Sequence, residues 1–219
     1  HSPETSSAAW GSIVASAQRH YEPGRLTTFI GYEFTSAPQG MNLHRNVIFS
    51  GSRAPEAPFT ALQSQNPEDL WQFLADFERQ NGAEVLAIPH NGNLSNGRMF
   101  TVETFDGKPL TKDLATLRAR FEPIIEATQI KGDSEAHPYL SPSDEFADYE
   151  KWDRSNLNGT EAKKPEMLQF EYAREALKTG LALERSLGVN PYKFGMLGST
   201  DAHTSLTAVE EDNFFGKHS

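Results

Sequence analysis

Four short polar segments of this 219-residue chain contain residues that could bind a metal ion. They are Glu33 in GYEFTS, His44 in NLHRN, His90 in AIPHNGN, and Asp201 with His203 in GSTDAH. Carboxylate oxygens and imidazole nitrogens together form a donor set that suits zinc, manganese or iron. Taken singly, a glutamate near a strand end is usually a solvated carboxylate, and a histidine within a strand is usually a hydrogen-bonded core residue. The Asp-x-His pair could likewise be a turn-capping aspartate beside an incidental histidine.

The four segments together indicate a shared site more strongly than any one of them does. Each follows a short apolar stretch, so their polar side chains should gather where neighbouring strands end. Three of the five histidines that lie away from the two ends of the chain fall in these segments. We therefore predict one metal site, formed by Glu33, His44, His90, Asp201 and His203.

A fifth polar segment, GDSEAHP, offers residues for the chemical step. Its Glu135 and His137 could be a general acid, further metal ligands or phosphate contacts, or could belong to an ordinary polar loop. Arg45 and Lys131 flank the polar segments and are candidates for holding a phosphate, although a solvated surface charge is the commoner role. The NGNLSNG segment at residues 91–97 could line a phosphate pocket or form a pair of tight Asn-Gly turns.

The pattern of apolar residues predicts the elements that would position these side chains. We expect helices at residues 3–21, 67–82 and 166–187, and strands at residues 26–34, 42–49, 85–89, 123–129 and 194–199. Asn66 and Pro67 form a strong helix start, because asparagine caps well and proline suits the first helical position. The polar stretch at residues 131–164 is expected to be a long loop. Apart from one hairpin, strands alternate with helices, which predicts an α/β fold with a largely parallel sheet or barrel.

Length and composition exclude several classes of protein. The chain is long enough for one sizeable domain, and 37% hydrophobic residues can supply a packed core. A formal charge of -10 makes it a poor partner for nucleic acid or an anionic membrane, and we expect neither. The absence of cysteine excludes disulfides, zinc-thiolate sites and cysteine nucleophiles. No apolar run could span a bilayer and no signal peptide is visible; we favour a periplasmic or secreted location over the cytoplasm.

At GYEFTS, NLHRN, IPHNGN and GSTDAH the chain resembles the PHP superfamily, the polymerase and histidinol phosphatase metal-dependent phosphoesterases. The segments AIPHNGNLSNG, QIKGDSEAHP and LSPSDEFADYE are similar to one bacterial branch, domain of unknown function 3604, over nearly the whole chain. The resemblance implies a distorted seven-stranded β/α barrel with two or three zinc, manganese or iron ions on its rim. Residues 1–219 would be a single domain, the C-terminal larger portion of such a barrel.

The same resemblance implies a role for each predicted ligand. Glu33 would match a glutamate that often bridges two metals, whereas His44 and His90 would each bind a single metal. Asp201 and His203 would close the site. The His-x-His motif that opens PHP proteins, and a further histidine after it, do not occur in this sequence. We therefore expect a fragment that is inactive alone, with the first-metal ligands supplied by an N-terminal segment of the same protein or by a partner chain.

The expected function is hydrolysis of a small-molecule phosphate or phosphonate ester by metal-activated water. His137 or Glu135 would protonate the leaving group. Two alternatives stay open: an amidohydrolase-like metal hydrolase acting on a carbon centre, and a non-catalytic domain that a metal stabilises. Phosphate bound between the metals would favour the phosphoesterase. A lysine that bridges the metals would favour the amidohydrolase-like enzyme, and a closed coordination shell would favour the non-catalytic domain.

Overall fold

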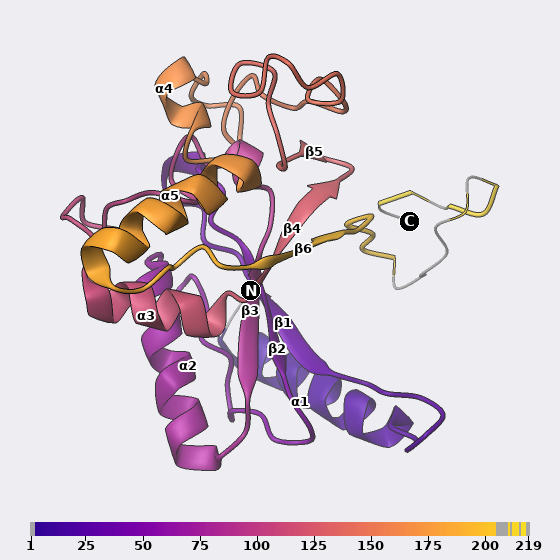
Figure 1. Ribbon diagram of the computed structural model, residues 1–219. Helices are drawn as coiled ribbons and strands as arrows, with labels where there is room; N and C mark the ends of the chain where they lie inside the picture. The colour runs from indigo at the N-terminus through magenta and orange to yellow at the C-terminus, as the bar shows by residue number, and fades with distance from the viewer. Residues whose placement is uncertain (1–2, 205–209, 211, 215, 218–219) are drawn as a thin grey trace.

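A computed structural model of the chain describes residues 3–204, 210, 212–214, 216 and 217. These residues form a mixed α/β fold with two three-stranded sheets and five α-helices (Figure 1). The helices are α1 (Pro3–His20), α2 (Pro67–Asn81), α3 (Lys112–Phe121), α4 (Pro165–Leu168) and α5 (Ala173–Leu187). The strands are β1 (Ile30–Phe34), β2 (Arg45–Phe49), β3 (Val85–Pro89), β4 (Ile124–Gln129), β5 (Gly132–Asp133) and β6 (Gly195–Gly198). Two short 3-10 helices, η1 (Pro38–Gly40) and η2 (Gly92–Leu94), follow β1 and β3.

The two sheets lie next to each other. The first has the order β1-β2-β3 and the second the order β5-β4-β6, and β3 lies against β4. The expected α/β class is confirmed at this level. The expectation of a largely parallel sheet is wrong, because only β4 and β6 run parallel and the other three pairings of the described strands are antiparallel. The described strands also form no closed barrel.

The connection between β2 and β3 explains why these strands are antiparallel although a helix separates them. Ser50, just after β2, donates its backbone N–H to Glu84 just before β3. Residues 50–66 then return along the sheet, because the Ser36 hydroxyl beyond the end of β1 donates to the Gln65 carbonyl at 2.5 Å. Helix α2 then runs back in the opposite direction. The chain thus crosses the sheet twice between the two strands, and β3 starts beside the end of β2.

Both α1 and α2 cover the same face of the first sheet. Phe49 of β2 contacts Trp10 of α1 and Phe77 of α2, with ring centroids 6.2 and 5.1 Å apart. Successive strand residues point to opposite faces, so residues next to this buried row point away from the helices. Glu33 of β1 and its cross-strand partner Asn46 are exposed and lie on that other face. The strand alternation therefore separates the core from the face that carries the predicted site.

The local signals for α2 are confirmed. The Asn66 side chain accepts a hydrogen bond from the Glu68 N–H, and Gly82 closes the helix in the left-handed conformation. The predicted β3, β4 and β6 are also present, and the first predicted strand is shorter, starting at Ile30. Helix α3 was not predicted, because its buried face includes the charged Arg118, which breaks the apolar pattern.

The predicted continuous helix at residues 166–187 is wrong, because the chain leaves the helical path between α4 and α5. The Phe170 carbonyl accepts from the Phe100 N–H, and the Glu171 carboxylate accepts from the Gly97 N–H. Glu171 is fully buried and pairs with Lys163 at 2.6 Å. A buried carboxylate requires such partners, and this requirement outweighs the helical propensity of the segment.

Gly92 lies close to the chain between α4 and α5, and this close packing leads to a prediction about stability. A Cβ atom at Gly92 would lie 2.4 Å from the Glu171 carbonyl oxygen and 3.2 Å from Phe100. Gly92→Ala should therefore lower the free energy of unfolding by about 1–3 kcal/mol through overpacking. Gly11→Ala in α1 is the matched control, because nothing lies within 4 Å of its added Cβ. Urea denaturation should show no loss for the control; equal stability of Gly92→Ala would contradict the prediction.

Candidate metal centre

Three of the predicted ligands meet at one edge of the first sheet. Glu33 lies near the end of β1, His44 immediately before β2, and His90 immediately after β3. Because β2 runs antiparallel to both neighbours, its first residues lie at the edge where β1 and β3 end. The side chains are thus brought together by the sheet register and not by proximity in sequence.

The geometry of the three side chains fits one metal ion. Glu33 Oε1 lies 3.0 Å from His44 Nδ1 and 2.9 Å from His90 Nε2. One potential donor atom from each residue lies within 4.8 Å of the other two. Donors bound to a single ion at 2.0–2.2 Å lie about 3 Å apart, so small adjustments would complete the coordination.

The electrostatics favour the protonation states that metal ligands need. Burial alone raises the pKa of the Glu33 carboxyl, but hydrogen bonds from His44 and His90 outweigh it and hold that pKa well below its usual range. Burial lowers the pKa of His44, and the neighbouring Glu33 offsets this only in part. An ionised carboxylate beside an imidazole with a lowered pKa offers two donor groups that suit a cation.

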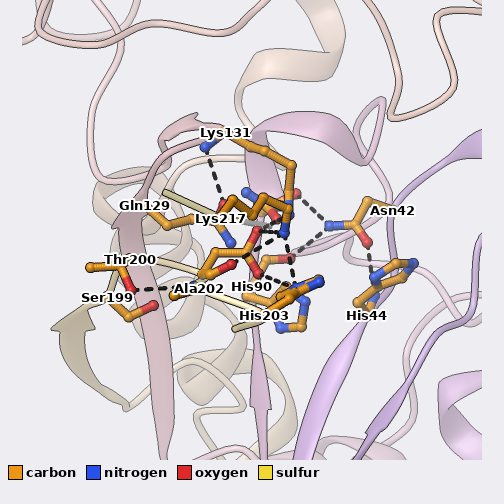
Figure 2. A network of polar contacts seen from close by, with 12 residues as sticks. Asn42, His44, His90, Gln129, Lys131, Ser199, Thr200, Ala202, His203 and Lys217 are labelled. Atoms are coloured by element: carbon orange, nitrogen blue, oxygen red, sulfur yellow. Dashed lines mark hydrogen bonds and ion pairs between the residues drawn. The ribbon is translucent and has the colours of Figure 1, made fainter. Parts of the chain in front are cut away.

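Asn42 holds the histidine segments in place and was not singled out from the sequence. Its buried side-chain amide donates to the carbonyls of His90 at 2.9 Å and Asn91 at 3.2 Å. Its oxygen accepts from the His44 N–H at 3.1 Å (Figure 2). The feature of the sequence that could have identified Asn42 is its position two residues before the histidine in NLHRN.

Asp201 and His203 lie on the wall of a cavity next to these three residues. The cavity has a volume of about 370 Å³, and its lining residues are Glu33, Asn46, His90, Glu126, Ser199, Thr200, Asp201, Ala202 and His203. The Asp201 carboxylate forms ion pairs with Lys131 and Lys217, and its Oδ1 lies 3.0 Å from His203 Nε2. Burial raises the pKa of Asp201, but the two lysines more than compensate and lower it. The structure therefore brings three predicted ligands together, and it places the other two on the lining of the adjacent cavity, in contact with lysines.

Glu126 is a further potential ligand that the sequence analysis did not propose. It lies on β4, is only 6% exposed and lines the same cavity. One carboxylate oxygen accepts from the Ser199 hydroxyl, whereas Oε1 has no hydrogen-bond partner among the described residues. A buried oxygen without a partner is costly, and a bound cation would satisfy it. The signal in the sequence was a glutamate within the apolar strand PIIEATQ.

The two residues predicted for the chemical step do not line the cavity. His137 Nε2 lies 2.8 Å from Asp153, and its Nδ1 accepts from the Tyr139 N–H at 3.1 Å, so both ring nitrogens are engaged. Glu135 pairs with Arg174 at 2.8 Å. Glu135 and His137 are therefore engaged with partners that do not line the cavity.

The predicted phosphate contacts also have other partners. Arg45 is 1% exposed and bonds to Glu122 at 2.9 Å inside the core, so it is neither a phosphate ligand nor a solvated charge. Asn91 and Asn96 adopt left-handed φ angles of 52° and 46°, which agrees with the turn interpretation of NGNLSNG. Lys131 remains beside the site, through its ion pair with Asp201.

Comparison with known families yields one match. The profile of a family described as "Protein of unknown function (DUF3604)" matches residues 1–219. No curated protein and no solved structure matches the chain. Among the helices of the described residues, none combines the length and apolar character needed to cross a membrane.

Proposed function

The chain belongs to the DUF3604 family, and we propose that it carries the metal site of a hydrolase that cleaves phosphate esters. The observation that supports this proposal most is the convergence of Glu33, His44 and His90 beside a cavity of about 370 Å³. The donor set of one carboxylate and two imidazoles suits zinc, manganese or iron. A site that stays open toward a cavity is typical of catalytic metal sites, whereas structural sites are closed.

The residues around the cavity would have different roles. Glu33, His44 and His90 would hold a divalent metal, which when bound acts as a Lewis acid and lowers the pKa of water. Asp201 and Glu126 offer further carboxylate oxygens on the lining of the same cavity. Lys131 and Lys217 bring positive charge to a chain with a formal charge of -10, and an anionic substrate needs such charge.

We also propose that the described sheets belong to a PHP-type barrel. The supporting observation is that Glu33 and Asn46 point away from the face covered by α1 and α2, as residues on the inner face of a barrel do.

The position of Lys131 favours one second candidate, a metal hydrolase acting on a carbon centre with a lysine as bridging ligand. Lys131 contacts Asp201, and its charge helps to lower the pKa of His44, so it lies close to both sets of predicted ligands. Lys131→Arg distinguishes the candidates. A guanidinium can still bind phosphate but cannot replace a bridging lysine, so retained activity would exclude the second candidate.

Chelation tests the proposed function directly. The whole protein should hydrolyse at least one class among phosphate monoesters, diesters and phosphonate esters. EDTA should abolish this activity, and manganese or zinc should restore it, because the metal supplies the activated water. Phosphate release would be measured before and after metal removal, with His90→Ala as the matched variant. Activity that survives both chelator and His90→Ala would contradict the proposal.

A further inference from the structure

The chain contains four Asn-Gly pairs, at residues 81–82, 91–92, 96–97 and 158–159. An asparagine followed by glycine can lose its side-chain amide without an enzyme, because glycine has no side chain to keep its backbone nitrogen away from the neighbouring side-chain carbonyl. The reaction needs an asparagine side chain that can turn toward this nitrogen, and it needs access for water. The fold therefore decides which of the four pairs reacts.

The fold protects three of the four pairs. Asn91 and Asn96 are 1% and 5% exposed, so water has little access to either side chain. The Asn96 amide also donates to a backbone carbonyl at 3.3 Å, and the buried Glu171 carboxylate accepts from the N–H of the following glycine at 2.9 Å. At the end of α2, the Asn81 amide donates to a helix carbonyl at 2.9 Å, and the next N–H is bonded within the helix cap. Burial or hydrogen bonding thus hinders the reaction at each of these pairs.

Asn158 differs from the other three asparagines. Both Asn158 and Gly159 are exposed in the 156–161 turn, which lies in the long loop between β5 and α4 (Figure 1). The hydrogen bonds of this turn use the side chains of Asn156 and Thr160, and none of them uses the Asn158 side chain. The Gly159 N–H makes one bond, to the Asn156 carbonyl at 3.1 Å, at a surface where water can replace it. The Asn158 side chain is therefore free to approach the nitrogen of Gly159.

The 156–161 turn also holds η1, the short helix that follows β1. Asn156 is 2% exposed, and its amide donates to the Gln39 carbonyl at 3.1 Å. The side-chain oxygen of Asn156 accepts from the Thr160 N–H at 2.9 Å, so the same residue closes the turn. A Cβ atom at Gly40 would lie 3.1 Å from Asn158 Cβ, so η1 packs closely against the turn. A change in the main chain at Asn158 would therefore act directly on η1.

We propose that Asn158 is a site of spontaneous deamidation, the first of the four pairs to react, and that its conversion to isoaspartate loosens the hold on η1. Hydroxide removes the proton of the Gly159 nitrogen, which attacks the side-chain carbonyl carbon of Asn158. A C–N bond forms and the bond to the side-chain nitrogen breaks, and ammonia leaves after taking a proton from water. Water then opens the cyclic imide at either carbonyl and gives aspartate or isoaspartate. Isoaspartate routes the main chain through an additional methylene group, which changes the geometry of the turn.

The consequence for the rest of the molecule follows from the position of η1. Asn42 lies two residues after η1, and its side chain bonds to the backbone of both His44 and His90. Loosening of η1 should therefore increase local opening over residues 38–44, which a faster exchange of their backbone amides would report. This inference does not depend on the proposed hydrolase function, because neither the reaction nor its measurement involves a metal or a substrate.

The experiment is ageing of the whole protein at mildly alkaline pH in water enriched in heavy oxygen, followed by peptide mass mapping. The peptide that contains Asn158 should take up the label and separate into aspartate and isoaspartate forms, whereas the peptide that contains Asn91 and Asn96 should stay unlabelled over the same time. In concentrated urea the four pairs should react at similar rates, because only the fold distinguishes them. Asn158→Gln is the matched variant, and it should take up no label at this position because its longer side chain would have to form a larger ring.

Hydrogen–deuterium exchange of the aged protein measures the effect on η1. Residues 38–44 should exchange several-fold faster in the aged wild type than in Asn158→Gln aged in the same way. Asn158→Asp carries the new charge without the additional methylene, and its exchange should equal that of the fresh wild type. Absence of label at Asn158, equal labelling of the buried pairs in the folded protein, or equal exchange of residues 38–44 in the aged wild type and aged Asn158→Gln would overturn the proposal.

Discussion

His90→Ala is expected to abolish metal binding at the centre formed by Glu33, His44 and His90 while the chain stays folded. His90 is 3% exposed, and its Nε2 lies 2.9 Å from the Glu33 carboxylate, so the substitution removes a donor that is buried beside the carboxylate. Loss of an outer hydrogen-bond partner of a metal ligand costs roughly 10–100-fold in affinity, and loss of the ligand itself should cost more. Glu33→Gln should have a similar effect, because it removes the only anionic donor of the three.

Calorimetric titration with zinc or manganese would measure this effect. His20→Ala at the exposed end of α1 is the matched control, and its metal affinity should equal that of the wild type. Affinity should also fall on acidification, because protons compete with the metal for imidazole and carboxylate. Tight stoichiometric binding by His90→Ala would show that the metal site lies elsewhere in the protein.

The largest loss of stability is expected for Glu122→Gln. Glu122 is 2% exposed and lies between Arg45 at 2.9 Å and Arg118 at 3.0 Å, both of which are buried. Trp71 donates its indole N–H to the same carboxylate. The neutral amide would leave two buried guanidinium groups without an anion, which should lower the free energy of unfolding by about 3–5 kcal/mol. Urea denaturation would measure it, with the exposed Glu56→Gln as a control expected within about 0.5 kcal/mol of the wild type.

The ionisation of the Glu122 carboxylate makes the free energy of unfolding depend on pH. Burial raises the pKa of Glu122, but the charges of Arg45 and Arg118 outweigh it, so the pKa in the folded protein lies below the ordinary value of 4.5. The stabilisation is therefore present above that value and is lost as the pH falls through the lowered pKa. Stability of Glu122→Gln should fall less steeply under acid than that of the wild type. Equal slopes would show that Glu122 is not ionised in the folded protein.

Local features of the sequence determined those parts of the protein that depend on neighbouring residues. The cap at Asn66 and the stop at Gly82 determined α2, because both act within one turn of the helix. The placement of Glu33, His44 and His90 beside apolar stretches identified them as candidates, but their meeting depends on the antiparallel direction of β2, which brings its first residues to the edge where β1 and β3 end. These residues could be named without knowing the direction of a single strand.

The tertiary structure alone decided which distant groups became partners. Lys131 and Asp201 are 70 residues apart and Arg45 and Glu122 are 77 apart, and nothing in either segment specifies the other. The break between α4 and α5 depends likewise on where Glu171 finds Lys163 and the Gly97 N–H. Helix and strand propensities are local and weak, whereas a buried charge must find its partner on whatever surface the fold brings against it. The sequence therefore named the candidate ligands, and only packing decided which charged residues face the cavity and which lie in the core.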